Sequence, residues 1–267
     1  MRKYIQLLIV MAGLMASAQE FKGIAVYESL TVRKDIPINT SGKMDPAREA
    51  MLKERLSKPV EATYTLTFDK TSSIYEQEQK LEAPVNGRVR PRSFVMGKTY
   101  KNLKDKIVLE EREIYGKEFL VTDSLRKTDW KLENETKKIG GYTCYKATRT
   151  ITFDAPETDA PKDKPVDATT AWLRKDRVTT AWYTPEIPVS HGPSYYWGLP
   201  GLILEVSTEH TTLLCSKITL NPKDKVEIKI PGRGEKITRE KFKETMRAKA
   251  EEMRDMRPEQ GNGRRRN

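Results

Sequence analysis

The sequence predicts a mainly β protein, built on a large curved antiparallel sheet or half-barrel with two helices. Apolar and polar side chains alternate over residues 62–69, where Tyr64, Leu66 and Phe68 share one face and threonines the other. This alternation is typical of a half-buried strand. Similar short segments recur along the chain between turn residues, whereas only two stretches have helical spacing. Regular short strands of this kind favour an antiparallel sheet.

The expected strands follow from alternation, β-rich composition and flanking turn residues. They lie at residues 23–28, 62–69, 72–78, 96–100, 106–114, 118–123, 130–132, 142–153, 169–174, 178–183, 202–209, 211–220 and 225–230. We expect the strands at 169–174 and 178–183 to form a hairpin, with Lys175-Asp176 at its turn.

Two helices are expected, near 46–56 and 238–257. Asp45 before Pro46 is the pairing of an N-cap residue with proline at the first helical position. In the second segment Phe242, Met246 and Met253 recur at helical spacing, and Pro258 follows. Methionines in such a stripe are usually core residues, with soft-metal binding as the alternative.

The N-terminus has the pattern of a secretory signal peptide. Arg2 and Lys3 precede an apolar run from Ile5 to Met15, and Ala16-Ser17-Ala18 forms an A-x-A cleavage site. We therefore expect residues 1–18 to be removed and the protein to be exported. An uncleaved anchor helix is the alternative, although the run is short for a bilayer, which needs about 20 apolar residues. No later segment is long and apolar enough to span one, so we do not expect an integral membrane protein.

The remaining 249 residues suit a single β-rich domain over 19–257. Charged insertions are expected near 32–60 and 155–167, and a disordered basic tail at 258–267. The full chain carries 49 Lys+Arg against 38 Asp+Glu, a net charge of +11. Such a surface attracts acidic partners such as anionic lipid, or is simply solvated. Export makes nucleic acid an unsuitable partner.

Cys144 and Cys215 both lie in strand-like runs. In an oxidising compartment they could form one disulfide, which would close a loop of about 70 residues and contribute about 4 kcal/mol. Two separately buried thiols are the alternative. Two cysteines and two histidines at no metal-ligand spacing do not indicate a metal site, and no motif indicates a cofactor.

Residues 182–206 form the most distinctive stretch. Pro185, Pro188 and Pro193 stiffen an extended connection, and Tyr195, Tyr196 and Trp197 follow with a large apolar area. Pro200-Gly201 fits the centre of a type II turn before a buried strand, because glycine accepts positive φ at the third position.

The six residues from Gly198 to Ile203 spell GLPGLI, and the chain resembles the family of that name. The resemblance includes an early Gly-x-x-x-Tyr strand (Gly23, Tyr27) and extends over most of residues 20–220; its further motifs are Trp130-Lys131-Leu132, the run from Lys138 to Ala147, Ala181 to Pro185, Ile187-Pro188 and Gly192-Pro193. It implies a bacterial protein exported to the envelope, from a family without an established activity. Family members often occur with outer-membrane transport systems. The resemblance supplies no catalytic residue. The residue types of the motif predict a rigid aromatic loop packed over one mouth of the sheet. The alternative is that the loop contacts a ligand through His191, Tyr195, Tyr196 and Trp197.

Two functional hypotheses follow. The first is a non-enzymatic binding or accessory protein of the periplasm or outer-membrane periphery, whose partner is an outer-membrane protein or an apolar or lipidic ligand. The second is a hydrolase acting on peptide or glycan with His191 in its site; a Cys–His pair is a further variant. The sequence has no Gly-x-Ser-x-Gly elbow, P-loop or dinucleotide fingerprint. A purely structural envelope protein is a third reading.

Overall fold

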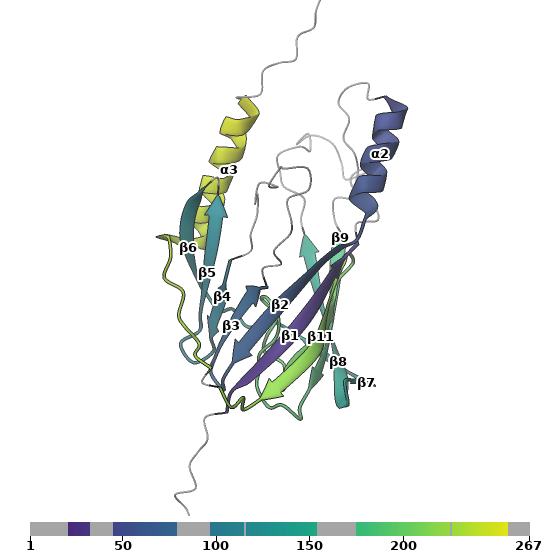
Figure 1. Ribbon diagram of the computed structural model, residues 1–267, viewed down its shortest axis with the longest axis vertical. Coiled ribbons are helices and arrows are strands. Elements are labelled where there is room, and N and C mark those ends of the chain that lie inside the picture. Colours follow the sequence, from purple (N-terminus) through teal and green to yellow (C-terminus); the bar gives the residue numbers. More distant parts are fainter. Residues whose placement is uncertain are drawn as a thin grey trace, which may run out of the picture.

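The computed structural model describes residues 21–32, 45–78, 97–114, 116–153, 175–224 and 226–255. Within them the chain forms one curved open sheet and two helices, which confirms the predicted fold class (Figure 1). The sheet is not closed into a barrel. The predicted signal peptide at 1–18, the insertion expected at 155–167 and the tail expected at 258–267 lie outside the described residues.

The twelve strands of the described chain are numbered as in Figure 1. They are β1 (Gly23–Thr31), β2 (Val60–Phe68), β3 (Ser72–Gln77), β4 (Thr99–Asn102), β5 (Ile107–Ile114), β6 (Lys117–Ser124), β7 (Lys131–Ile139), β8 (Tyr142–Phe153), β9 (Lys175–Thr184), β10 (Leu202–Ser207), β11 (Thr211–Leu220) and β12 (Glu235–Thr238). The helices are α2 (Pro46–Ser57) and α3 (Arg239–Asp255).

The strand order is β12-β6-β5-β4-β3-β2-β1-β11-β10-β9-β8-β7. Every pairing in this order is antiparallel except that of β12 with β6, which is parallel. β1 therefore lies in the middle of the sheet, between β2 and the late strand β11. This arrangement brings the two halves of the chain together along the first strand.

The alternation of apolar and polar residues in β2 buries one face of the strand, as predicted. Leu66 and Phe68 are completely buried, and Tyr64, half-buried, stacks on Tyr75 with ring centroids 5.0 Å apart. Leu66 and Phe68 belong to the main hydrophobic core cluster, together with Ala25 and Tyr27 of β1. A one-residue slip of β2 would turn this set away from the core, so the pattern fixes the register.

Both predicted helices are present. The side chain of Asp45 accepts a hydrogen bond from the backbone N–H of Ala47 at 3.1 Å, and Pro46 opens α2. In α3, Phe242 and Met246 pack against a cluster formed by Ile114, Phe119, Val121 and Ile237. The described part of the chain contains no helix long and apolar enough to cross a membrane.

Two details of the predicted secondary structure are wrong, and one predicted strand is longer than expected. Residues 226–230 are not a strand, and the edge of β6 is occupied instead by β12, whose Ile237 is buried in the cluster beneath α3. Lys175 and Asp176 are not a turn, because they pair with Phe153 and Thr152 as the first residues of β9. The strand expected at 130–132 continues to Ile139, and its charged, exposed residues suit its place at the sheet edge. The strand predicted at 169–174 lies outside the described residues.

Candidate functional site

The distinctive stretch of the sequence forms the loop between β9 and β10, residues 185–201, which we call the aromatic loop. It folds back on itself through backbone hydrogen bonds. The N–H of Gly198 donates to the carbonyl oxygen of Ser190 at 3.1 Å, and that of Ile203 donates to His191 at 3.0 Å. Ile187 and Val189 are buried in the main core cluster, and Leu199 lies in a neighbouring one. The loop is therefore anchored by its own apolar residues.

The type II turn predicted at Pro200-Gly201 is wrong. The N–H of Leu202, which would close such a turn on Leu199, donates instead to the carbonyl oxygen of Ile187 at 3.0 Å. Gly201 is needed for a different reason. A Cβ atom there would lie 2.1 Å from the carbonyl oxygen of Thr184, so only glycine allows the two backbone segments to approach. Gly198, with a φ of +92°, adopts the left-handed backbone conformation that favours glycine.

A buried lysine that sequence reasoning missed holds the aromatic loop against the sheet. Lys101 of β4 is 0% exposed, and its Nζ donates to the carbonyl oxygens of Gly192, Ser194 and Tyr196 at 2.7, 2.8 and 3.2 Å. These bonds use the three donors of the ammonium group. Burial lowers the pKa of Lys101 to about 7.

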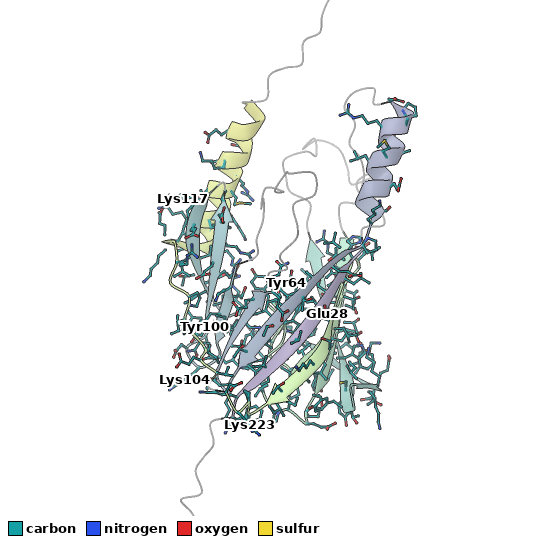
Figure 2. The ribbon with its side chains drawn as sticks, in the orientation of Figure 1. Glu28, Tyr64, Tyr100, Lys104, Lys117 and Lys223 are labelled. Atoms are coloured by element: carbon teal, nitrogen blue, oxygen red, sulfur yellow. The ribbon has the colours of Figure 1, made fainter. Side chains whose placement is uncertain are left out.

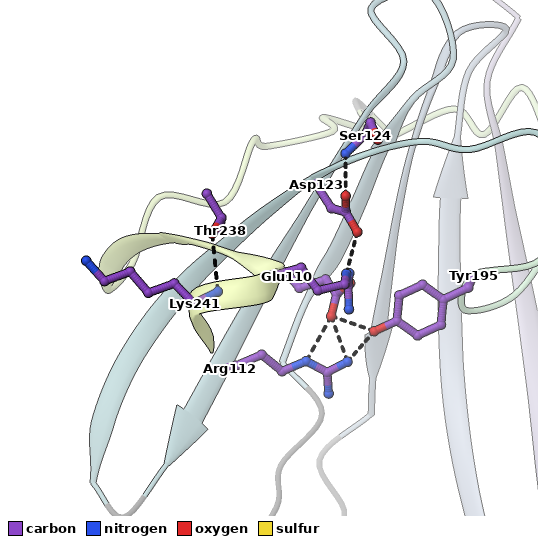
Figure 3. A network of polar contacts seen from close by, with 8 residues as sticks. Glu110, Arg112, Asp123, Ser124, Tyr195, Thr238 and Lys241 are labelled. Atoms are coloured by element: carbon purple, nitrogen blue, oxygen red, sulfur yellow. Dashed lines mark hydrogen bonds and ion pairs between the residues drawn. The ribbon is translucent and has the colours of Figure 1, made fainter. Parts of the chain in front are cut away.

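A second buried charge fixes Tyr195. The Oε2 atom of Glu110, a residue only 1% exposed, accepts a 2.5 Å hydrogen bond from the Tyr195 hydroxyl (Figure 3). The same atom accepts from Nε and Nη2 of Arg112 at 2.9 and 2.7 Å, and Arg112 also donates to the Tyr195 hydroxyl. Burial, followed by the Glu110 charge, raises the pKa of Tyr195 to about 12. The tyrosine thus stays protonated and donates to the carboxylate.

The first residue of α3 completes this network. Arg239 donates through Nη2 to Oε1 of Glu110 and through Nε to Oδ2 of Asp123, the latter at 2.5 Å. Its guanidinium also lies 5.7 Å from the centre of the Tyr195 ring. Two arginines and two carboxylates therefore balance one another around the tyrosine. The network joins β5, β6, α3 and the aromatic loop.

The four predicted site residues differ in accessibility. Tyr195 is 38% exposed, whereas Tyr196 and Trp197 are half-buried. Tyr196 packs near Trp130, and the indole N–H of Trp130 donates to the carbonyl oxygen of Trp197 at 2.8 Å. Among these four residues, Tyr195 is therefore the one whose side chain is exposed to a partner.

His191 is completely buried, next to the ring of Phe68. Neither ring nitrogen forms a hydrogen bond with a described residue, and the nearby charge and backbone of Asp69 act to raise the pKa of the imidazole. Burial and then the Lys101 charge dominate, and the pKa of His191 falls to about 3. The imidazole is neutral at ordinary pH and out of contact with solvent. It is not placed to act as a base on a substrate.

The cysteines are likewise unsuited to nucleophilic chemistry. Cys144 and Cys215 are buried thiols in the main core cluster. Burial raises the pKa of Cys144 to about 11 and that of Cys215 to about 12, so both stay protonated. Both are free thiols in the structure, and the Cys144–Cys215 disulfide stays a prediction. No three His, Cys, Asp or Glu side chains gather into a metal site within the described ranges.

Comparison with known proteins finds a match to one family model over part of the chain. Residues 130–205 match the family model described as "Protein of unknown function (Porph_ging)". The matched segment contains β7, β8, β9, the aromatic loop and most of β10. A search of curated proteins found no match.

Two solved structures are similar in outline. They are described as "Structure of PNGF-II in C2 space group", with 14% identity and a TM-score of 0.47, and "Structure of PNGF-II in P21 space group", with 15% identity and a TM-score of 0.49. The alignments cover 85% and 84% of this chain. The chain spans about a third of the length of those proteins, 32% in each case.

Proposed function

We propose that the chain is an exported, non-enzymatic binding or accessory protein of the bacterial envelope, of the GLPGLI family, acting beside an outer-membrane protein. The N-terminal signal pattern supports export. The family-model match supports the family, because residues 130–205 include Trp130-Lys131-Leu132 and the run from Gly198 to Ile203 that carry the resemblance.

The observation that supports a binding role is the fixed, exposed ring of Tyr195. Its hydroxyl is held by Glu110, and the backbone on either side is held by Lys101. A tyrosine already fixed in one position loses little conformational freedom on association, and aromatic side chains dominate the energetics of interfaces. The aromatic loop is then a preorganised contact surface.

The surroundings of Tyr195 favour a protein partner over a lipid. The side chains that contact it are charged: Glu110, Arg112 and Arg239. A rim of charged groups around a central aromatic side chain is typical of protein–protein interfaces, whereas an acyl chain needs an apolar lining. The hydrolase alternative would require His191 to reach a substrate, and its complete burial argues against that.

A crosslinking experiment tests the proposal. A photoreactive phenylalanine analogue is placed at position 195 and, in a second variant, at position 145, in the cells that make the protein. Tyr145 is a matched control, because it is also a tyrosine with 38% exposure. We expect a discrete crosslinked envelope protein from position 195 and none from position 145. Identical products, or none from position 195, would contradict the binding role.

Two further readouts test export and the cysteines. The intact mass of protein recovered from the envelope should correspond to a chain starting at Gln19, as the A-x-A site predicts. A mass two hydrogens lower would reveal the Cys144–Cys215 disulfide. Recovery of the full chain in the cytosolic fraction would refute export.

A further inference from the structure

Five short segments meet at one end of the sheet. They are residues 21–22, 69–71, 103–106, 125–129 and 221–224, and we call this surface the basic end. Antiparallel strands bring them together: β1, β3 and β5 begin there, and β2, β4, β6 and β11 end there. Three backbone hydrogen bonds join neighbouring segments: Leu103 N to Thr71 O at 2.8 Å, Leu125 N to Lys106 O at 2.7 Å and Asn221 N to Lys22 O at 2.8 Å. Figure 2 labels Lys104 and Lys223 at this end.

The basic end carries an excess of positive charge. Its segments contain seven Lys or Arg and four Asp, a net charge of +3. Six of the cations are exposed and form no ion pair with any described residue: Lys70, Lys104, Lys106, Arg126, Lys127 and Lys223.

The nearby carboxylates do not neutralise these cations through contact. Asp69 accepts hydrogen bonds from the backbone N–H groups of Thr71 and Ser72 at 2.7 Å, which shapes the β2–β3 turn. Asp105 accepts a 2.8 Å bond from Asn102 within the β4–β5 turn. By contrast, Lys117 and Lys137 on the strands contact Glu235 and Glu205. The positive charge of the basic end therefore faces solvent.

The kind and arrangement of these cations indicate the partner. Five of the six are lysines, whose flexible stems carry compact charges without the rigid fork by which arginine recognises one anion. All six are exposed and spread over four turns, so they do not converge on a single ligand. A group of such charges at one end of a molecule is complementary to an extended anionic surface. Each cation near an anionic membrane contributes about 1 kcal/mol to the free energy of binding.

We propose that the basic end docks the protein on a membrane surface carrying anionic phospholipid headgroups. This inference rests on the proposed envelope location, which places the mature chain beside a membrane. The headgroups would contact the turns at the ends of the strands. Docking is peripheral and electrostatic, so it weakens as salt rises.

The test is flotation of the purified mature chain with vesicles of phosphatidylcholine, with or without phosphatidylglycerol. A variant carrying Lys70→Gln, Lys104→Gln and Lys223→Gln removes three charges from the basic end. The matched control carries Lys236→Gln, Lys241→Gln and Lys243→Gln, which remove three charges that are likewise exposed, from β12 and α3. We expect binding to the anionic vesicles only, a loss of about 100-fold in the first variant and a much smaller loss in the control.

Several outcomes would overturn the proposal. These are no binding to anionic vesicles, equal loss in both variants, or a larger loss in the control, which would assign binding to α3. Displacement by inorganic phosphate at constant ionic strength would assign the cations to a discrete phosphate site instead of a membrane. None of these results bears on the crosslink expected from Tyr195, so the two proposals fail separately.

Discussion

The buried hydroxyl of Tyr27 donates a 2.7 Å hydrogen bond to the carbonyl oxygen of Ile203. The bond joins the strand of the early Gly-x-x-x-Tyr pattern to the end of the Gly198–Ile203 segment, 176 residues away in the sequence. Tyr27 is completely buried, and burial raises the pKa of its hydroxyl, which therefore remains a donor at all ordinary pH values. Two separate motifs of the sequence thus meet in one buried contact.

Replacing Tyr27 by phenylalanine should destabilise the fold, because it leaves the buried carbonyl of Ile203 without this donor. A loss of about 1–3 kcal/mol in the free energy of unfolding is expected. Urea denaturation of the wild type and the Tyr27→Phe variant measures it. Tyr64→Phe is the control, since Tyr64 is a half-buried tyrosine whose hydroxyl forms no hydrogen bond with a described residue. Equal losses in the two variants would show that the bond to Ile203 is energetically unimportant.

Glu110 and Tyr195 should be energetically coupled. Glu110→Gln removes the charge that holds two arginines and the tyrosine, and we expect a loss of about 2–4 kcal/mol, because breaking a buried pair leaves charge without compensation. Tyr195→Phe removes only the hydroxyl. A double-mutant cycle between the two should give a coupling of at least about 0.5 kcal/mol. The same cycle with Tyr145→Phe should be additive, and additivity in both cycles would contradict the network.

Much of the fold could be predicted because its signals are local. The alternation around Leu66 marks β2, and Asp45-Pro46 marks the start of α2. The strand predicted at 142–153 has the bounds of β8. Local patterns failed where the pairing of strands determines the secondary structure. Residues 226–230 have a strand-like sequence but pair with no described strand. Glu235–Thr238 form β12 because β6 has a free edge with which they can pair.

The candidate site was only partly predictable. Tyr195 could be identified from its unusual aromatic, proline-rich surroundings. Lys101 and Glu110 could not, since nothing in the sequence distinguishes them among the 49 basic and 38 acidic residues of the chain. Their role depends on burial, which the register of β3, β4 and β5 decides. The β4 sequence Thr-Tyr-Lys-Asn is largely polar and suggests exposure, yet its lysine lies beneath the aromatic loop and donates to it.

The burial of Lys101 should make stability depend on pH in a defined direction. Its pKa is about 7 in the folded protein, against an ordinary value of 10.5. Between these values the unfolded chain binds a proton at Lys101 that the folded chain lacks, so the free energy of unfolding rises with pH. Below about pH 7 both states are protonated, and the cost of burying the ammonium is present in full. The slope in the window is at most about 1.4 kcal/mol per pH unit.

Comparison with Lys101→Met isolates this contribution, since methionine keeps the apolar stem and cannot titrate. The stability difference between wild type and Lys101→Met, measured by urea denaturation across this window, should shift in favour of the wild type as pH rises. Lys104→Met at an exposed turn position is the control, and its difference should be flat. If the Lys101→Met difference is flat as well, the ammonium keeps its proton throughout. In that case its bonds to Gly192, Ser194 and Tyr196 outweigh the effect of burial, and Lys101 is a permanently charged clamp on the aromatic loop.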